Sequence, residues 1–361
     1  MHIILDKYIT KLYYKNLLFT IFTFLTIFIS IDIIEKLDLF IDSEISSNEI
    51  LKFYILSIPS FFHISLPMSV LITTIFTLGT LIRDNEIEPI IMSGTRTFRI
   101  YISILVSGLF ISIASFFIED NFVIKSQNMR NEIQKKYSFE KKSKNKNKIE
   151  PTFFRLPNNR ILIIKNYDYA NKKAHSISIQ HFDNEKIIDR IDASAMFFVK
   201  ETNSWNLPKH ERRTLNNGKH SYNFVETDTT IDLGTFLSDT LRLLQKPELM
   251  NYNQLGLFIS DFKESGNKNP RWDVNHKFRI SFASTSFIMT LFGVGIALNR
   301  RNRNIAVNIG IGILSIFAYY VTIKFFQTLG YYGTLESLEA VWIPNILFLF
   351  IGFYLVRRIQ T

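Results

Sequence analysis

The sequence contains no cysteine. The protein therefore forms no disulfide, has no thiolate zinc site and uses no thiol nucleophile. The sequence also lacks a GxxxxGK(S/T) phosphate loop, an HExxH motif and a GxSxG motif. Without a phosphate loop the chain is not expected to hydrolyse ATP itself, and we predict no catalytic residues on it.

Charge is also missing from long stretches of the chain. No Asp, Glu, Lys or Arg occurs in residues 16–31, 280–299 or 304–323. As helices, such runs have the length needed to cross a bilayer core of about 30 Å at about 1.5 Å per residue. The 47% of hydrophobic residues are thus gathered in uncharged runs, which indicates a membrane protein.

Six membrane-spanning helices are expected from these runs. Lys7, Lys11 and Lys15 precede the first one, as in a signal peptide, but the run is longer than a signal sequence and no small-x-small cleavage site follows it. We therefore expect a retained first helix. The predicted spans are residues 16–34, 53–82, 100–118, 278–298, 304–326 and 341–356.

Residues 119–276 differ in kind from the spans. A lysine-rich stretch at 135–148 is most simply a solvated connector, and short alternating segments such as 160–167 and 175–182 follow it. Many short strands punctuated by turn residues predict an antiparallel sandwich, barrel or jelly roll. Residues 251–276 are expected to form an amphipathic helix returning to the membrane. The predicted domains are 1–118 with three spans, 119–276 with the β domain, and 277–361 with three more spans.

The short loops predict the orientation. The Lys and Arg clusters at 7–15, 83–99, 300–303 and 357–358 all fall on one side of a six-span topology, whereas the acidic loops at 35–52 and 328–340 fall on the other. Positive charge marks the cytoplasmic side. Both termini are then cytoplasmic and the β domain is extracytoplasmic. We attribute the net charge of +10 to the orientation of a membrane protein rather than to a nucleic-acid site, so no nucleic-acid partner is expected.

The charged elbow at residues 83–99 is the strongest candidate site. We expect a short helix over about 84–96, with Glu86 beside an apolar face formed by Ile87, Ile90, Ile91 and Met92. Such a helix can lie in the groove of a partner while a charged residue fixes its register. An ordinary solvated loop is the alternative. The predicted coupling residues are Arg83, Glu86, Ile90, Gly94 and Arg96.

A second candidate site is cationic and lies near the opposite membrane face. Lys36, Lys52 and Lys324 fall at the outer ends of predicted spans and could meet the phosphates of an amphiphile. The alternative is that each lysine only places its amine in the membrane interface. The seven histidines are scattered without metal-ligand spacing, so no metal site is expected, and His63 inside the second span is read as structural.

Four segments in order, around a β insertion of the right size, resemble the lipopolysaccharide export permeases of the LptF/LptG family. The first two are LDKYITKLYYKNLL (5–18) and IDIIEKLD (31–38). The third, residues 66–100, looks like the second helix and coupling helix, and residues 329–358 look like the sixth-helix signature with Trp342, Pro344 and Asn345. Pro89 departs from the pattern, because the family usually has a helix former there.

The resemblance implies a permease subunit that extracts lipopolysaccharide or a related amphiphilic lipid from the outer leaflet of the bacterial inner membrane. It implies three protein partners: a cytoplasmic LptB-like ATPase that binds the ATP, a second permease of the family, and LptC/LptA-like periplasmic bridge proteins. Glu86 matches the acidic residue that contacts the ATPase, and basic residues at the outer end of the first helix meet lipid phosphates, which favours Lys36. No cofactor on this chain is implied. The resemblance does not distinguish LptF from LptG.

Three other classes of protein are also compatible with the sequence. A mechanotransmission permease of an ABC transporter has a similar layout but usually four spans. A structural or signalling membrane protein could bind an extracytoplasmic ligand through the β domain. A membrane-embedded enzyme is the least favoured of these alternatives, because the spans contain no paired acid and base.

Overall fold

The computed structural model describes residues 2–43, 45–95, 97–137, 152–156, 160–168, 173–183, 186–199, 204–216, 219–225, 229–231, 249–264, 269–299 and 304–359. The chain divides into two compact units, Met1–Phe139 with Pro270–Thr361, and Glu140–Asn269. Most of the predicted connector at 135–148 lies outside the described residues. Each unit is described by itself.

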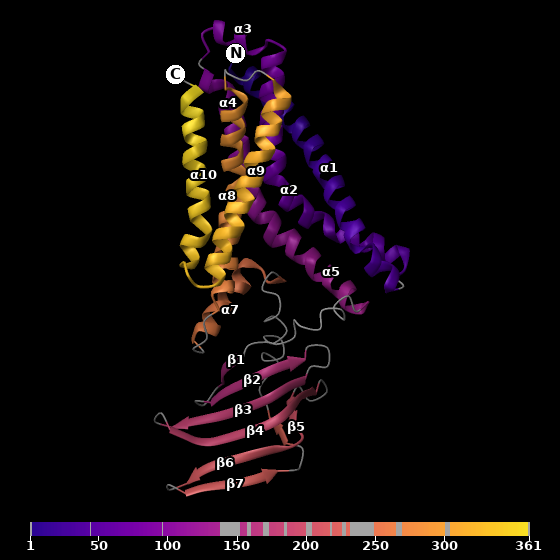
Figure 1. The fold of residues 1–361 in the computed structure, drawn as a ribbon, viewed down its shortest axis with the longest axis vertical. Helices are drawn as coiled ribbons and strands as arrows, with labels where there is room; N and C mark the ends of the chain where they lie inside the picture. The colour runs from indigo at the N-terminus through magenta and orange to yellow at the C-terminus, as the bar shows by residue number, and fades with distance from the viewer. Residues whose placement is uncertain are drawn as a thin grey trace. The chain divides into compact units, whose positions relative to one another are not determined.

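The first unit is helical (Figure 1). Its long helices are α1 (His2–Asp42), α2 (Ser47–Arg83), α4 (Thr97–Ile118), α8 (Pro270–Ala297), α9 (Ile305–Tyr331) and α10 (Ser337–Ile359), and the short α3 (Ile87–Met92) lies between α2 and α4. Within the described residues, six helices are long and apolar enough to cross a membrane. The predicted six-span membrane architecture is confirmed. The start of α1 and the end of α10 lie at the same end of this unit as α3, which we call the α3 end.

Helix α8 is the centre of the helical unit. Its most apolar window is 83% buried, against 11% for α1 and 22% for α9. It packs against α2, α4, α9 and α10. Gly293 lies against Thr74 of α2, and Gly295 against Leu355 of α10. In a membrane, small residues of this kind let helix backbones approach closely, because association there depends on packing rather than on the hydrophobic effect.

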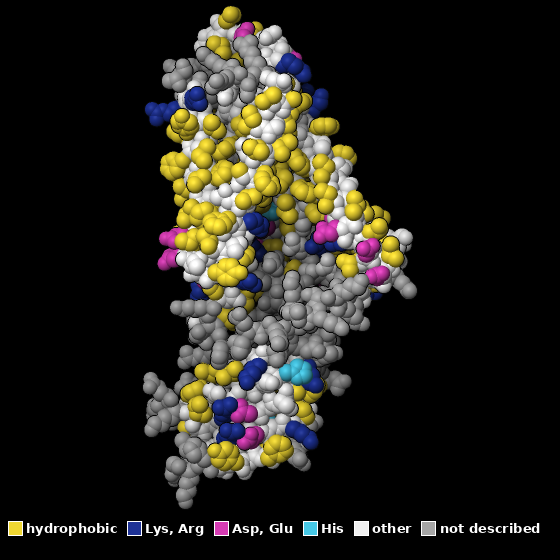
Figure 2. All heavy atoms as spheres, viewed as in Figure 1, with side chains coloured by type: hydrophobic (Ala, Val, Ile, Leu, Met, Phe, Trp, Pro, Cys, Tyr) yellow, Lys and Arg dark blue, Asp and Glu magenta, His cyan; other side chains and the backbone are white. Residues whose placement is uncertain are grey.

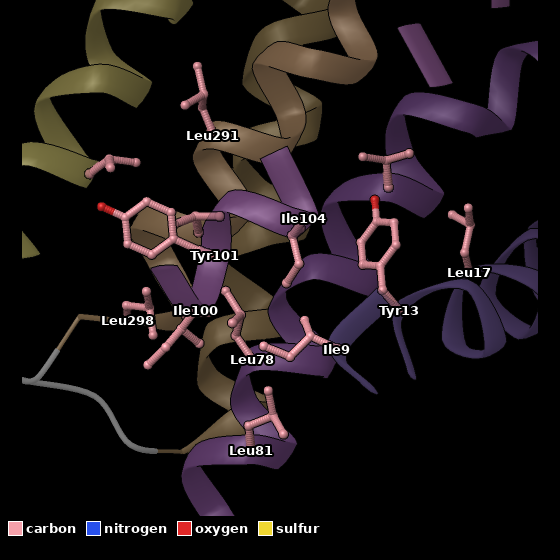
Figure 3. Close-up of a cluster of buried hydrophobic side chains, with 14 of the residues drawn as sticks. Ile9, Tyr13, Leu17, Leu78, Leu81, Ile100, Tyr101, Ile104, Leu291 and Leu298 are labelled. Atoms are coloured by element: carbon pink, nitrogen blue, oxygen red, sulfur yellow. The ribbon is translucent and has the colours of Figure 1, made fainter. Parts of the chain in front are cut away.

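A buried apolar cluster closes the α3 end of the helical unit (Figure 3). Ile9 and Tyr13 of α1 pack there with residues of α2, α4 and α8, and both are fully buried. Further along the same two helices, Asn16 Nδ2 donates to Thr77 Oγ1 at 2.9 Å, and the hydroxyls of Thr20 and Thr73 are 2.6 Å apart. These polar pairs fix α1 against α2 where water is excluded.

The outer surface of the helical unit is apolar over most of its length. Figure 2 shows hydrophobic side chains covering the visible face of the helices, with charged side chains towards the two ends. Leu314 and Phe317 of α9 and Phe353 of α10 are among the exposed apolar residues. In a water-soluble protein so large an apolar surface would be a liability, but it suits contact with lipid.

The second unit contains an antiparallel sheet, as predicted. Its strands are β1 (Thr152–Leu156), β2 (Arg160–Asp168), β3 (Lys173–Asp183), β4 (Lys186–Val199), β5 (Ser204–Leu207), β6 (His210–Asn216), β7 (Lys219–Val225) and β8 (Thr229–Ile231). The first four pair in sequence order, and the long β4 then pairs with both β5 and β6. Leu162 and Ile164 of β2 pair with Ile179 and Ile177 of β3, so alternate residues form the buried face.

The helical unit extends beyond residue 118, where the sequence predicts that the third span ends. Helix α4 continues through a π-helical turn, η1 (Glu119–Val123), into α5 (Ile124–Lys136). The polar residues of α5 made it look like part of the β domain, but they face polar groups of α2. Gln127 donates to Ser60 Oγ at 3.3 Å, and Lys136 pairs with Glu49 at 2.7 Å.

Two predicted helices are shorter than expected. In place of one amphipathic helix over 251–276, α7 (Tyr252–Glu264) ends and α8 begins at Pro270. Proline suits a first helical position because the N–H it lacks would have no partner there. The elbow helix covers 87–92 rather than 84–96, because Asn85 (φ 56°) and Gly94 (φ 84°) interrupt it on both sides.

We predict that Gly295→Ala destabilises the helical unit by about 1–3 kcal/mol, the usual effect of overpacking. A Cβ at Gly295 would lie 2.6 Å from the Leu355 Cβ, so α8 and α10 would have to separate. The measurement is the thermal unfolding temperature of the purified chain in detergent.

The matched control is Gly310→Ala in α9, where an added Cβ meets no atom within 4 Å. Alanine favours a helix over glycine by about 1 kcal/mol at both positions. The control is therefore expected to unfold at the same or a higher temperature. Equal behaviour of the two variants would mean that the α8–α10 contact is not closely packed.

Candidate functional site

The elbow between α2 and α4 is short, and backbone hydrogen bonds fix its conformation. The N–H of Glu86 donates to Leu81 O at 3.0 Å, which folds the chain back on the end of α2. Arg83 pairs with its neighbour Asp84 at 2.9 Å, and both side chains are largely exposed, so this ion pair contributes little stability. Pro89 lies within the first turn of α3, where a backbone donor is not needed.

The apolar residues of α3 divide between two faces. Ile87 is 8% exposed and belongs to the buried cluster at the α3 end, and Ile90 packs against the same cluster. Ile91 and Met92 are exposed, Met92 to 87%. The structure therefore places Ile90 against the protein's own core, and the apolar surface available to another molecule is formed by Ile91 and Met92.

The Glu86 carboxylate lies at the start of α3. Its Oε2 accepts a hydrogen bond from the Tyr8 hydroxyl of α1 at 2.8 Å. At the other end of the short helix, the Gly94 N–H donates to Ile91 O at 3.0 Å with a positive φ of 84°. This is a glycine cap that turns the chain towards α4. Arg96, the remaining predicted coupling residue, lies outside the described residues.

The three predicted cationic residues differ in their neighbours. Lys36 of α1 pairs with Asp32 at 2.5 Å and lies 5.2 Å from the Phe53 ring centroid. Lys324 of α9 donates to Gln327 Oε1 at 3.0 Å and lies 5.9 Å from the ring of Phe278. Lys52 of α2 is exposed. Lys36 is thus neutralised by a carboxylate, whereas the partner of Lys324 is a neutral amide.

The sequence reading missed Arg130. The Arg130 guanidinium lies 5.5 Å from the same Phe53 ring as Lys36, and it donates to Ser57 Oγ at 3.4 Å. The sequence predicts Arg130 in the β domain, because the residues that follow the third apolar run are polar. The available signal was the continued helical spacing of Phe122, Met129 and Ile133 beyond the apolar run.

A second missed group is buried inside the helical unit. Arg279 of α8 is 5% exposed, with Glu119 Oε1 at 3.8 Å and Asp120 Oδ1 at 3.7 Å. His63 of α2 lies 3.8 Å from the other Glu119 oxygen and packs on the ring of Phe282. The π-helical turn widens the helix where Glu119 and Asp120 occur, so two consecutive carboxylates approach one guanidinium.

The depth of these buried charges follows from helix geometry. The 22 residues of α4 carry the chain about 33 Å from the α3 end to Glu119. That distance is close to the thickness of a bilayer core, about 30 Å. These charges therefore lie near the boundary of the apolar region. Within the described residues, no group of three His, Asp or Glu side chains could hold a metal ion.

Comparison with known proteins gives one family. The family described as "Lipopolysaccharide export system permease LptF/LptG" matches residues 7–358, which is nearly the whole chain. No curated protein matches the sequence. The match covers the six apolar helices, the elbow and the antiparallel sheet.

We predict that Arg279→Met destabilises the helical unit by about 2–4 kcal/mol, because it leaves the partly buried Glu119 and Asp120 carboxylates without this buried cation. The measurement is thermal unfolding in detergent. Adding Glu119→Gln to this variant is expected to recover part of the loss.

Arg83→Met is the matched control, since Arg83 forms an exposed ion pair with Asp84 at 2.9 Å in the same unit. Its expected effect is within about 1 kcal/mol. An Arg279→Met protein as stable as the unaltered chain would show that the buried charges do not hold the helices.

Proposed function

Because the chain belongs to the lipopolysaccharide export system permease LptF/LptG family, we propose that it is the permease subunit of an ATP-driven lipid exporter. Its cargo is lipopolysaccharide or a related amphiphilic lipid, extracted from the outer leaflet of the inner membrane. The observation that carries the proposal is the elbow. A short helix between two membrane spans exposes Ile91 and Met92 beside the Glu86 carboxylate.

The ATPase is a separate, LptB-like subunit on the cytoplasmic side. Helix α3 is too short to be stable alone, but Ile87 and Ile90 anchor it to the helical unit. Its exposed apolar residues would lie in a groove of the ATPase, and a cation of the ATPase would pair with Glu86. Movement of the ATPase then acts on α2 and α4, which are joined by the elbow.

A second permease of the same family completes the assembly. Helices α1 and α9 have the least-covered apolar windows of the six spans, at 11% and 22%. Membrane helices that another protein does not cover face lipid. A partner permease packed on α1 and α9 would enclose a cavity that admits a lipid from the side.

Cationic side chains at the outer ends of the spans would bind the phosphates of the lipid. Lys324 is the stronger candidate, because the described residues place no carboxylate in an ion pair with it. Lys36 shares its charge with Asp32. A phosphate would therefore meet a cation without a carboxylate partner at Lys324, whereas at Lys36 the Asp32 carboxylate would compete with it for Lys36 and the neighbouring Arg130.

The β unit would receive the lipid in the periplasm and continue into a bridge of LptC/LptA-like proteins. Among the described strands, β7 pairs with β6 alone and β1 with β2 alone. Such strand edges accept a further strand from another protein. This supports a continuous sheet between the permease and the bridge.

We predict that Glu86→Arg abolishes export while leaving the chain folded in the membrane. Reversing the charge removes the pair with the ATPase and adds repulsion, which is expected to weaken ATPase binding by at least about tenfold. The measurements are co-purification of the ATPase and lipid export from proteoliposomes containing the complex.

The control is Glu339→Arg in the first turn of α10, at the end of the helical unit opposite α3. It makes the same charge change away from the elbow, so ATPase binding should persist. Full export by Glu86→Arg would remove α3 from the coupling site. A native chain that purifies with no ATPase would instead favour a membrane protein whose β unit binds a ligand.

We also predict that Lys324→Gln lowers lipid binding more than Lys36→Gln does. Both substitutions remove one charge, but only Lys324 lacks a carboxylate partner among the described residues. The measurement is the amount of phosphorylated lipid retained per complex in detergent at increasing salt. Lys11→Gln, an exposed lysine of α1 towards the α3 end, serves as control, and a larger loss for Lys36 than for Lys324 would contradict the assignment.

A further inference from the structure

The first turns of α1 contact the elbow both before and after α3, although they are far from it in sequence. The Tyr8 hydroxyl donates to Glu86 Oε2 at 2.8 Å, just before α3. Asp6 accepts from Arg99 Nη2 at 2.7 Å and from Ser103 Oγ at 2.9 Å, just after it. One short segment of α1 thus binds both the chain that enters the elbow and the chain that leaves it.

The part of α1 that makes these contacts is anchored by buried residues. Ile9 and Tyr13, which follow on the same helix, are fully buried between α2 and α4 (Figure 3). Further from the α3 end, the most apolar window of α1 is only 11% buried. At the far end of α1, Phe40 is buried against Phe53 and Tyr54 of α2, whereas none of residues 22–39 is buried. Helix α1 is therefore held near its two ends and largely uncovered between them.

The Tyr8 contact also affects the Glu86 carboxylate directly. A free glutamate side chain at the surface samples several rotamers, and a partner must order it on binding. A hydrogen bond to Oε2 holds the carboxylate in one orientation and leaves Oε1 able to accept from a second donor. Hydrogen bonds to an ionised carboxylate are stronger than those between neutral groups.

We propose that the first turns of α1 belong to the coupling machinery. Tyr8 is a positioning residue that orients Glu86 for the ATPase, and Tyr8 and Asp6 together tie α1 to the elbow. A displacement of α3 would then move α1 directly, in addition to moving α2 and α4. This inference rests on the proposed function, because it assumes that an ATPase binds the elbow.

The first test is Tyr8→Phe in the complete complex, which removes the hydroxyl and keeps the ring. ATPase affinity is expected to fall about three- to tenfold, and fewer lipids should be exported per ATP hydrolysed. The unfolding temperature should stay that of the unaltered chain, since Tyr8 is exposed. Tyr14→Phe, on the same helix away from the elbow, is the control and should leave both quantities unchanged.

The second test exchanges the charges of the Asp6–Arg99 pair. Asp6→Arg and Arg99→Asp each place like charges together, so the number of lipids exported per ATP should fall severalfold in each single variant. The double variant restores an opposite-charge pair and should regain most of the coupling. Tyr8→Phe keeps the test decisive if a single exchange lowers the yield of folded protein.

The outcomes separate this inference from the proposed function. If the unaltered chain binds an ATPase and exports lipid, but Tyr8→Phe matches it in affinity and in lipid exported per ATP, the inference alone is wrong. A double charge exchange as defective as the single ones would also overturn the tie through Asp6. If the unaltered chain binds no ATPase, the proposed function and this inference both fail.

Discussion

The close packing of α8 is the constraint on which the helical unit depends. In lipid, apolar side chains gain little by leaving their surroundings, so helices associate through close contact and interhelical hydrogen bonds. Glycines of α8 meet α2 on one side and α10 on another, and the Asn345 amide of α10 donates to the Ser281 carbonyl of α8 at 2.7 Å. The Tyr319 hydroxyl of α9 donates to the same Asn345 side chain. One helix therefore positions four others.

Much of this architecture could be predicted from the sequence, because the bilayer imposes simple rules. Uncharged runs of sufficient length identify the spans, and alternating segments with turn residues identify the sheet. The limits of the elements were harder to predict. The polar α5 belongs with the spans only because partners such as Ser60 and Glu49 face it from α2, a tertiary fact that composition does not contain. The elbow helix is bounded by positive φ angles at Asn85 and Gly94, and an asparagine in that conformation is not evident from sequence.

The candidate site was predictable in location but not in orientation. The sequence places Glu86 and four apolar residues on one short segment, yet only the fold shows that Ile87 and Ile90 serve the protein's own core. In the same way, the resemblance favours Lys36 over Lys324, although only the structure shows that Lys36 pairs with Asp32 and Lys324 with a neutral amide. Arg279 was missed because its carboxylate partners are 160 and 159 positions away, at Glu119 and Asp120.

The distribution of polar contacts assigns different mechanical roles to the helices. Most of helix α8 is covered by protein, and its buried Arg279 is paired with the turn that joins α4 to α5. Moving α8 would break close contacts and expose charge, so it is suited to be a fixed frame. Helix α1 is fastened at the α3 end and, through the buried Phe40, at its other end, and along the span between them it can exchange lipid for another apolar surface at little cost. Under the proposed coupling, a force applied at the elbow would be resisted by α8 and taken up by the less covered α1.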